Sequence, residues 1–191
     1  GGLTAFDRET GQFGISSESH LSERLEGAKV NTIYEDHDKI LWIGTWDDGL
    51  FVVDPDVGEI RHYGHSNGDP YGLNSGVVVS IFQDRERTLW IGLVAGGVDK
   101  LTADNRVFEY VVHDPNDENS LSHDWIRSVI EDKAGHLWVS TGGGSLNRYD
   151  PLTGFWRHYV NDPEDPASIS SDFLSSVLED SEGRIWIATM N

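Results

Sequence analysis

The sequence predicts an all-β protein built from four repeated units, each of them a small antiparallel sheet. The first observation is that four tryptophans recur at a constant spacing of 48 residues, at Trp42, Trp90, Trp138 and Trp186. The second is that four aspartates keep the same spacing, at Asp36, Asp84, Asp132 and Asp180. The third is that each unit holds short runs of β-branched and aromatic residues between turn residues, a pattern typical of strands. Such self-similarity indicates a repeat architecture.

The first strand of each unit is expected just before the repeated aspartate, over residues 30–36, 78–84, 126–132 and 174–180. A tight turn follows, opened by the aspartate side chain. In the third and fourth units the turn closes with Gly135 and Gly183, which can adopt positive φ. Lys39 and Arg87 replace this glycine in the first two units. Those two turns are therefore expected to be strained or differently shaped.

The second strand carries the repeated tryptophan and is expected over 41–45, 89–92, 137–141 and 185–189. A small residue stands two places after each tryptophan, which leaves room for an indole or backbone of the next unit; these residues are Gly44, Gly92, Ser140 and Ala188. Glycine-rich loops lead to a third strand, over 49–54, 97–101 and 145–150. A further turn leads to a fourth strand, as at 60–63 and 156–159.

Four short antiparallel strands with an aromatic anchor describe the blade of a β-propeller, and such a blade buries both faces only by stacking on its neighbours. The sequence predicts one domain over 1–191, with blades at 30–63, 78–111 and 126–159. A fourth blade is expected to be split, with 174–191 at the C-terminus and 1–13 at the N-terminus, because the two ends continue the repeat in phase.

Three arrangements of the ring follow from this split. The chain closes alone as four blades, two chains form a homodimeric ring by exchanging the strands of their split blades, or the chain is a segment of a longer array. Unpaired strand edges attract partners, so we expect the two ends to be paired.

Charge and composition exclude several classes of protein. The chain has 33 acidic and 14 basic residues, for a formal net charge of −19. Nucleic-acid binding is excluded because phosphate contacts need a basic face, and attachment to an anionic membrane surface is disfavoured for the same reason. The absence of cysteine excludes disulfides and cysteine-based zinc sites. No apolar run suits a transmembrane helix or signal peptide, so no direct membrane contact is expected.

Two stretches carry a family resemblance. One runs from Asp114-Pro115 through Ser120-Leu121-Ser122 to Glu131-Asp132, and the other is Ile185-Trp186-Ile187-Ala188-Thr189. In register with their counterparts, they resemble the two-component regulator propeller repeat, and the resemblance covers essentially the whole chain. It implies the periplasmic or extracellular sensor portion of a membrane-anchored regulator, often a hybrid histidine kinase, which in several members responds to oligosaccharides. Such regulators typically carry two propellers of about seven blades, so the chain is expected to be the ligand-receiving part.

Residues that break the repeat are the candidates for ligand binding, whereas the repeated residues are interpreted as framework. The loops after the second strands and those entering each blade should share one face, around the mouth of the channel. The candidates on that face are Trp46, Tyr71, His123, Asp124, Trp125, Arg127 and Phe173. Aromatic rings stack on the apolar faces of sugars while polar neighbours bond the hydroxyls. The alternative is that Trp125 and Phe173 plug the channel or cap the core.

No catalytic constellation is predicted. Serine and histidine are present without a glycine-flanked nucleophile elbow, although in so acidic a chain the sequence does not exclude a glycosidase-like carboxylate pair. The turns account for the repeated aspartates without a metal, and a weak calcium site at Asp36 and Asp38 is the alternative. No cofactor is expected. The sequence predicts a non-catalytic oligosaccharide sensor; the second hypothesis is a protein-interaction or oligomerisation scaffold, and the third is a propeller-type lyase or glycosidase.

Overall fold

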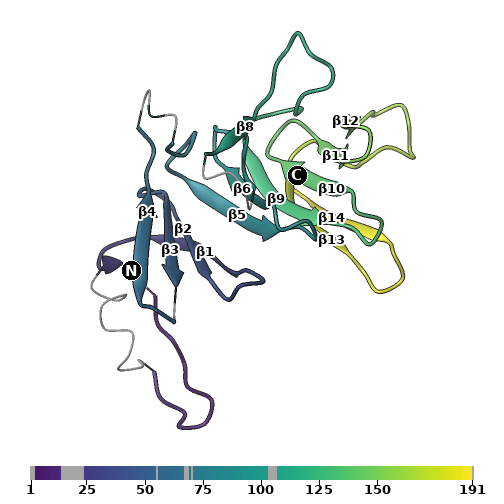
Figure 1. Ribbon diagram of the computed structural model, residues 1–191. Coiled ribbons are helices and arrows are strands. Elements are labelled where there is room, and N and C mark those ends of the chain that lie inside the picture. The colour runs from purple at the N-terminus through teal and green to yellow at the C-terminus, as the bar shows by residue number, and fades with distance from the viewer. Residues whose placement is uncertain are drawn as a thin grey trace.

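The computed structural model of the protein describes residues 3–13, 24–54, 56–66, 69, 71–102 and 107–190. Its named elements, β1 to β14, are all strands, and all the strand pairs are antiparallel. They form three four-stranded sheets and one two-stranded sheet, which follow one another in chain order (Figure 1). The predicted all-β propeller architecture is confirmed.

The strand bounds lie close to those expected from the repeat. The first sheet comprises β1 (Val30–Glu35), β2 (Leu41–Thr45), β3 (Leu50–Asp54) and β4 (Glu59–Tyr63). The second comprises β5 (Val78–Gln83), β6 (Leu89–Leu93), β7 (Val98–Leu101) and β8 (Glu109–Val111). The third comprises β9 (Ile126–Glu131), β10 (Leu137–Thr141), β11 (Leu146–Asp150) and β12 (Phe155–Tyr159). The fourth holds β13 (Leu174–Glu179) and β14 (Ile185–Thr189).

The core consists of apolar layers between neighbouring sheets. Trp42, on the first sheet, packs with Ile81, Leu89 and Ile91 of the second. Later layers join the second sheet to the third and the third to the fourth in the same way. Because each sheet buries its faces only against its neighbours, the stability of one sheet depends on the next.

The repeated indoles lie in these layers, as predicted, wherever a further sheet follows. Trp42 and Trp90 are 7% and 5% exposed, and Trp138 is partly buried against the fourth sheet. Trp186 is 57% exposed, and Leu178, its partner on the neighbouring strand, is 61% exposed. The last tryptophan is exposed because the described residues place no sheet in front of β13 and β14.

The repeated aspartates hold the turn between the first and second strands. One carboxylate oxygen of Asp132 accepts from the amides of Ala134 and His136, each at 2.9 Å, while the other accepts from the Trp138 indole at 2.8 Å. The other three aspartates make the same bonds in their own sheets. These bonds lower the pKa of Asp132 and Asp180 although burial opposes them. The framework interpretation is supported because the carboxylates bind their own chain.

Lys39 and Arg87 adopt the strained conformation that the missing glycines predict. Their φ angles are +63° and +66°, in the left-handed region that Gly135 and Gly183 occupy at the same place. The turn keeps its shape, since the aspartate still accepts the same two amides. The first two units therefore carry backbone strain that the last two avoid.

Lys39→Gly should stabilise the protein by about 0.5–1 kcal/mol. The left-handed region costs a non-glycine residue roughly 1–2 kcal/mol, and the extra chain entropy of glycine offsets part of that gain. Urea denaturation measures the change. Arg87→Gly is the matched comparison and should gain less, because Arg87 also pairs with Asp38 at 2.8 Å. A loss of stability in Lys39→Gly would contradict the assignment of strain.

Gly44 and Gly92, which follow the first two repeated tryptophans, make room for the next sheet, as predicted, but the neighbour is an aliphatic side chain. A Cβ on Gly44 would lie 2.5 Å from Cγ1 of Val78, and one on Gly92 would lie 2.7 Å from Cγ2 of Ile126. Both contacts are shorter than atoms tolerate. The expectation of an indole or backbone there is therefore wrong, since the gap is filled by the first residue of the next sheet's first strand, Val78 of β5 or Ile126 of β9.

The predicted split blade is not confirmed by the described residues. Leu3, Leu25 and Ala28 pack against Ile43 and neighbouring side chains on the outer face of the first sheet. Phe6 and Phe13 form an isolated bridge with each other. The fourth sheet contains β13 and β14 alone. The described N-terminal segment thus covers the first sheet and does not complete the fourth, and exchange of strands in a homodimer stays a prediction.

Candidate ligand-binding site at the channel mouth

The loops after the second strands lie beside the segments that enter the innermost strands, as predicted. The amide of Trp46 donates to the Lys29 carbonyl at 3.0 Å, and that of Gly142 donates to the Trp125 carbonyl at 2.8 Å. The other two sheets repeat this bond, from Val94 to Val77 and from Met190 to Phe173. The bond fixes two positions of each sheet on one face. Because only backbone atoms take part in it, the side chains at these positions differ from one sheet to the next.

A cavity of about 230 Å³ lies where the first strands of the four sheets, which we call the innermost strands, converge. It is lined by one residue from each of β1, β5, β9 and β13, together with one loop indole; these are Asn31, Val79, Arg127, Ser175 and Trp46. The four strand residues occupy the same position of the repeat, 48 residues apart. Side chains of all four sheets therefore face one space, which corresponds to the channel of a propeller.

Arg127 is the cationic residue of this cavity. Its guanidinium lies over the Trp125 ring, 5.6 Å from the centroid, in a cation–π contact. Its Nη2 donates to the sulfur of Met190 at 3.6 Å. The structure thus brings together four residues at the mouth: Arg127 of β9, Trp125 just before that strand, Trp46 after β2 and Met190 after β14.

Trp125 and Phe173 both lie against the glycine loop after β10. A Cβ on Gly142 would lie 3.1 Å from the Trp125 ring, and one on Gly143 would lie 3.3 Å from the Phe173 ring. Side chains at these glycines would therefore displace the two rings. Trp125 and Phe173 remain 40% and 55% exposed, so each ring packs on the loop and presents apolar surface to solvent.

His123 and Asp124 hold the loop that positions Trp125. Nδ1 of His123 accepts from the Trp125 amide at 3.0 Å, and Oδ1 of Asp124 accepts from the His113 amide at 2.7 Å. Ser171 and Asp172 make the corresponding bonds one repeat later. Tyr71 is 63% exposed in the loop before β5, and its described bond is from its amide to Asp69. The structure therefore joins His123 and Asp124 to the site through the backbone and places Tyr71 apart from the cavity.

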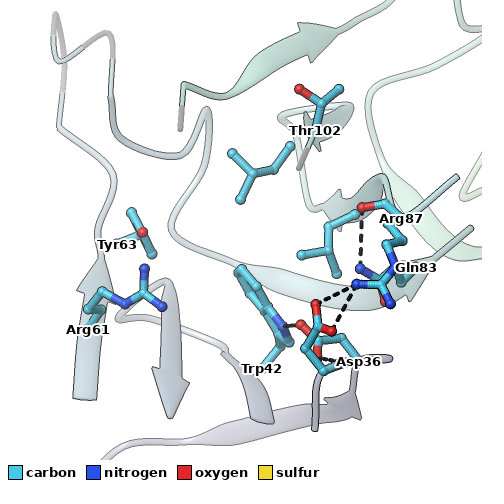
Figure 2. A pocket seen from close by; sticks show the side chains of 10 residues that line it. Asp36, Trp42, Arg61, Tyr63, Gln83, Arg87 and Thr102 are labelled. Carbon is cyan, nitrogen blue, oxygen red and sulfur yellow. Dashed lines mark hydrogen bonds and ion pairs between the residues drawn. The ribbon is translucent and has the colours of Figure 1, made fainter. Parts of the chain in front are cut away.

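A second cavity, also of about 230 Å³, lies beside the β1–β2 turn between the first two sheets (Figure 2). Asp36, Trp42 and Gln83 line it, and Arg87 crosses its edge to Asp38, with bonds of 2.8 and 2.9 Å. A cavity of about 220 Å³ at the corresponding place between the second and third sheets is lined by Asp84 and Trp90. Because this cavity recurs with the framework residues, it is a property of sheet stacking and a weaker candidate than the channel mouth.

The comparisons with known proteins agree with the repeat. A family model described as the two component regulator propeller matches residues 24–47, 72–94, 120–143 and 168–191. The chain belongs to the two-component regulator propeller family. No curated protein matched the chain in a sequence comparison.

Two solved structures similar to this propeller are extracellular domains of hybrid two-component systems from B. thetaiotaomicron. One is 20% identical with a TM-score of 0.75, and the alignment covers 98% of this chain and 24% of that domain. The other is 26% identical with a TM-score of 0.68, covering 96% of the chain and 23% of that domain. The chain thus spans about a quarter of these relatives. The predicted location, periplasmic or extracellular, agrees with both of them.

A virginiamycin B lyase from Staphylococcus aureus has the same fold at greater distance. It is 16% identical with a TM-score of 0.61, and the alignment covers 84% of this chain and 49% of the lyase. Identity at this level shows the shared propeller fold alone.

Sequence reasoning missed the residues that join one propeller sheet to the next beside the aspartate turns. The His37 amide donates to Oε1 of Gln83 at 2.9 Å, and the Lys133 amide donates to Oε2 of Glu179 at 2.7 Å. Arg85 donates to the Asp132 carbonyl at 2.6 Å across another junction. The signal was present, because Gln83 and Glu179 occupy the same repeat position.

The described residues contain no group of three or more histidine, cysteine, aspartate or glutamate side chains placed to hold a metal ion. Within that same part of the chain, no helix is both long and apolar enough to span a membrane.

Proposed function

We propose that this propeller segment is the ligand-receiving part of a two-component regulator and that it binds an oligosaccharide at its channel mouth. One observation carries the proposal: two half-exposed indoles, Trp46 and Trp125, adjoin a cavity that the four innermost strands share. Aromatic faces with a few convergent polar groups are the usual lining of a small-molecule site. The proposal assigns no bond chemistry to the site.

Each side chain at the mouth has a physical role in this proposal. The Trp46 and Trp125 rings supply flat apolar surface for the faces of sugar rings. Asn31 and Ser175, on strands at opposite ends of the stack, supply polar groups for hydroxyls. Phe173 extends the apolar surface beside Trp125.

Binding at this position would act on the arrangement of the sheets. The cavity is lined from all four sheets, so a ligand that contacts several walls favours the arrangement in which those contacts coexist. A ligand shifts such an equilibrium only by its difference in affinity between the two arrangements. Transmission to a kinase would follow from that shift.

Calorimetry with a panel of oligosaccharides tests the site. The Trp46→Ala, Trp125→Ala double variant should weaken binding of any active oligosaccharide by at least about tenfold, because stacked aromatic anchors carry a large share of binding energy. Trp186→Ala is the matched control, since Trp186 is also exposed but lies on β14 of the last sheet and does not line the cavity. Unchanged affinity in the double variant would place the site elsewhere, and release of new reducing ends would favour an enzyme.

A second candidate function, an oligomerisation scaffold, is favoured by the fourth sheet. Trp186 and Leu178 are exposed on its face, and β14 pairs with β13 alone among the described strands. An open strand edge beside apolar side chains is a surface that another chain can join. Sedimentation at micromolar concentration separates a dimer from a monomer.

A further inference from the structure

We infer that the saccharide carries an anionic group, a carboxylate or a sulfate, which pairs with Arg127 inside the channel. The inference rests on the proposed function and names the chemical class of its ligand. It depends on what the guanidinium contacts, on the charge of its surroundings and on the size of the cavity.

The Arg127 guanidinium lacks an oxygen partner in the described part of the chain. Its described contacts are the Met190 sulfur at 3.6 Å and the face of the Trp125 ring. A guanidinium carries five N–H donors, and a thioether sulfur is a weak acceptor. Most of the donor capacity of Arg127 is therefore available to solvent or to a ligand in the cavity that it lines.

Carboxylates that could pair with Arg127 are plentiful, because the chain has 33 acidic and 14 basic residues. Lys29, at the same mouth, is neutralised by Asp47 at 2.8 Å. Elsewhere Arg87 pairs with Asp38 at 2.8 Å, and Lys100 pairs with Glu109 at 3.3 Å. Carboxylates are in excess over the surface, yet none of the described ones pairs with Arg127.

The other strand residues that line the cavity do not compensate the charge of Arg127. At the same repeat position the three neighbouring strands carry Asn31, Val79 and Ser175, which are neutral. The net charge of −19 opposes an anion at long range, but salt screens charges beyond about 8 Å at physiological ionic strength. Near the guanidinium, the short-range pairing dominates, and its planar fork suits the two oxygens of a carboxylate or sulfate.

The cavity admits only a small group. Its volume of about 230 Å³ is below the roughly 300–1,000 Å³ of pockets that enclose drug-sized ligands. One sugar residue, the anionic one, therefore enters the channel. The remaining residues of the saccharide lie over Trp46 and Trp125 at the mouth.

The experiment compares three probes of equal length by calorimetry: a galacturonate trisaccharide, a sulfated galactose trisaccharide and neutral galactotriose. Arg127→Gln should weaken binding of the preferred anionic probe by about 10–100-fold, as expected for loss of a charge-assisted hydrogen bond. Arg127→Lys should retain part of the affinity. Arg157→Gln is the matched control, because Arg157 also lies over an aromatic ring but on β12, the outermost strand of the same sheet; it should change affinity less than twofold.

The outcomes separate this inference from the proposed function. Stronger binding of one anionic probe than of galactotriose, lost in Arg127→Gln alone, supports the inference and shows whether a carboxylate or a sulfate is preferred. Equal binding of galactotriose, unaffected by Arg127→Gln, overturns the inference and leaves the proposed function standing. No binding of these probes or of the wider oligosaccharide panel overturns both. The comparison of probes on the unaltered protein decides the matter even if Arg127→Gln does not fold.

Discussion

Trp90→Ala should lower the free energy of unfolding by about 3–5 kcal/mol, the usual cost of removing a large buried aromatic side chain. Trp90 is 5% exposed and packs with Val129, Leu137 and Val139 of the third sheet. Its loss leaves a cavity between two sheets, because the surrounding side chains are packed in place and cannot move far enough to fill it. Guanidinium denaturation, followed by circular dichroism, measures the effect.

Trp186→Ala is the matched control for this result. Trp186 makes the same bond to its turn aspartate, Asp180, at 2.7 Å, but its ring is 57% exposed. Its replacement should change the free energy of unfolding by about 0.5 kcal/mol, as is usual for surface substitutions. Equal losses in the two variants would show that the indole–aspartate bond matters and that packing between the sheets does not.

Asp99→Asn should stabilise the protein at pH 8 by about 2–4 kcal/mol and have little effect at pH 4. Asp99 is fully buried on β7, and its Oδ1 has no hydrogen-bond partner, while Oδ2 accepts from the Asn74 amide at 2.9 Å. Burial raises the pKa of Asp99 to about 7 from its ordinary 3.8, against the opposing effects of the Asn74 amide and His65. Each unit of such a shift corresponds to about 1.4 kcal/mol.

The sign follows from which state binds the proton more tightly. Between pH 4 and 7 the folded protein holds a proton on Asp99 that the unfolded chain has released, so stability falls as pH rises through this window. Asparagine resembles the protonated acid and carries no charge to bury. Asn147 occupies the corresponding place in the third sheet, accepting from the Ser122 amide and donating to the Val139 carbonyl at 3.3 Å.

Urea denaturation at pH 4 and pH 8 measures this difference. Asp165→Asn, at an exposed turn where the carboxylate accepts from the Ala167 amide, is the control and should behave alike at both pH values. If Asp99→Asn destabilised the protein equally at pH 4 and pH 8, the buried carboxylate would be neutral or solvated at both.

The fold was predictable because its decisive contacts are local and recur. The bonds of Asp132 reach only residues two, four and six places ahead, so one motif contains the turn, the strand and the indole. Lys39 and Arg87 could be recognised as strained from the same motif, since glycine stands in the other two copies. Four repetitions separate such signals from chance.

The arrangement of the ends could not be predicted in the same way. Continuity of the repeat indicated that the N-terminal residues complete the fourth sheet, whereas Leu3 packs against the apolar cluster of the first sheet that contains Ile43 and Phe51. A short apolar segment can cover either surface, and its sequence does not record which. That choice depends on contacts between parts of the chain that share no local pattern.

The candidate site was predicted in part. A departure from the repeat predicted Trp46 and Trp125, and Arg127 was predicted as a polar neighbour. The structure brings the three to one mouth, and their binding of a ligand stays a prediction. The same criterion chose His123, although its ring nitrogen performs the task of the Ser171 hydroxyl. A change of residue type can preserve a hydrogen bond, so variation alone does not identify a binding residue. Asn31 and Ser175 were missed because small polar residues on a strand are ordinary until its neighbours in space are known.

The uncovered face of the fourth sheet has a consequence for how the molecule opens. Since each layer is held by its neighbours, local unfolding requires least free energy at an edge with one partner. Fraying should therefore begin at β14 and proceed toward the N-terminal layers. Ser175 would be the first wall of the channel to leave, and any molecule bound there would hold that wall in place. Occupancy of the mouth would then increase the protection of the β13 and β14 amides against hydrogen exchange.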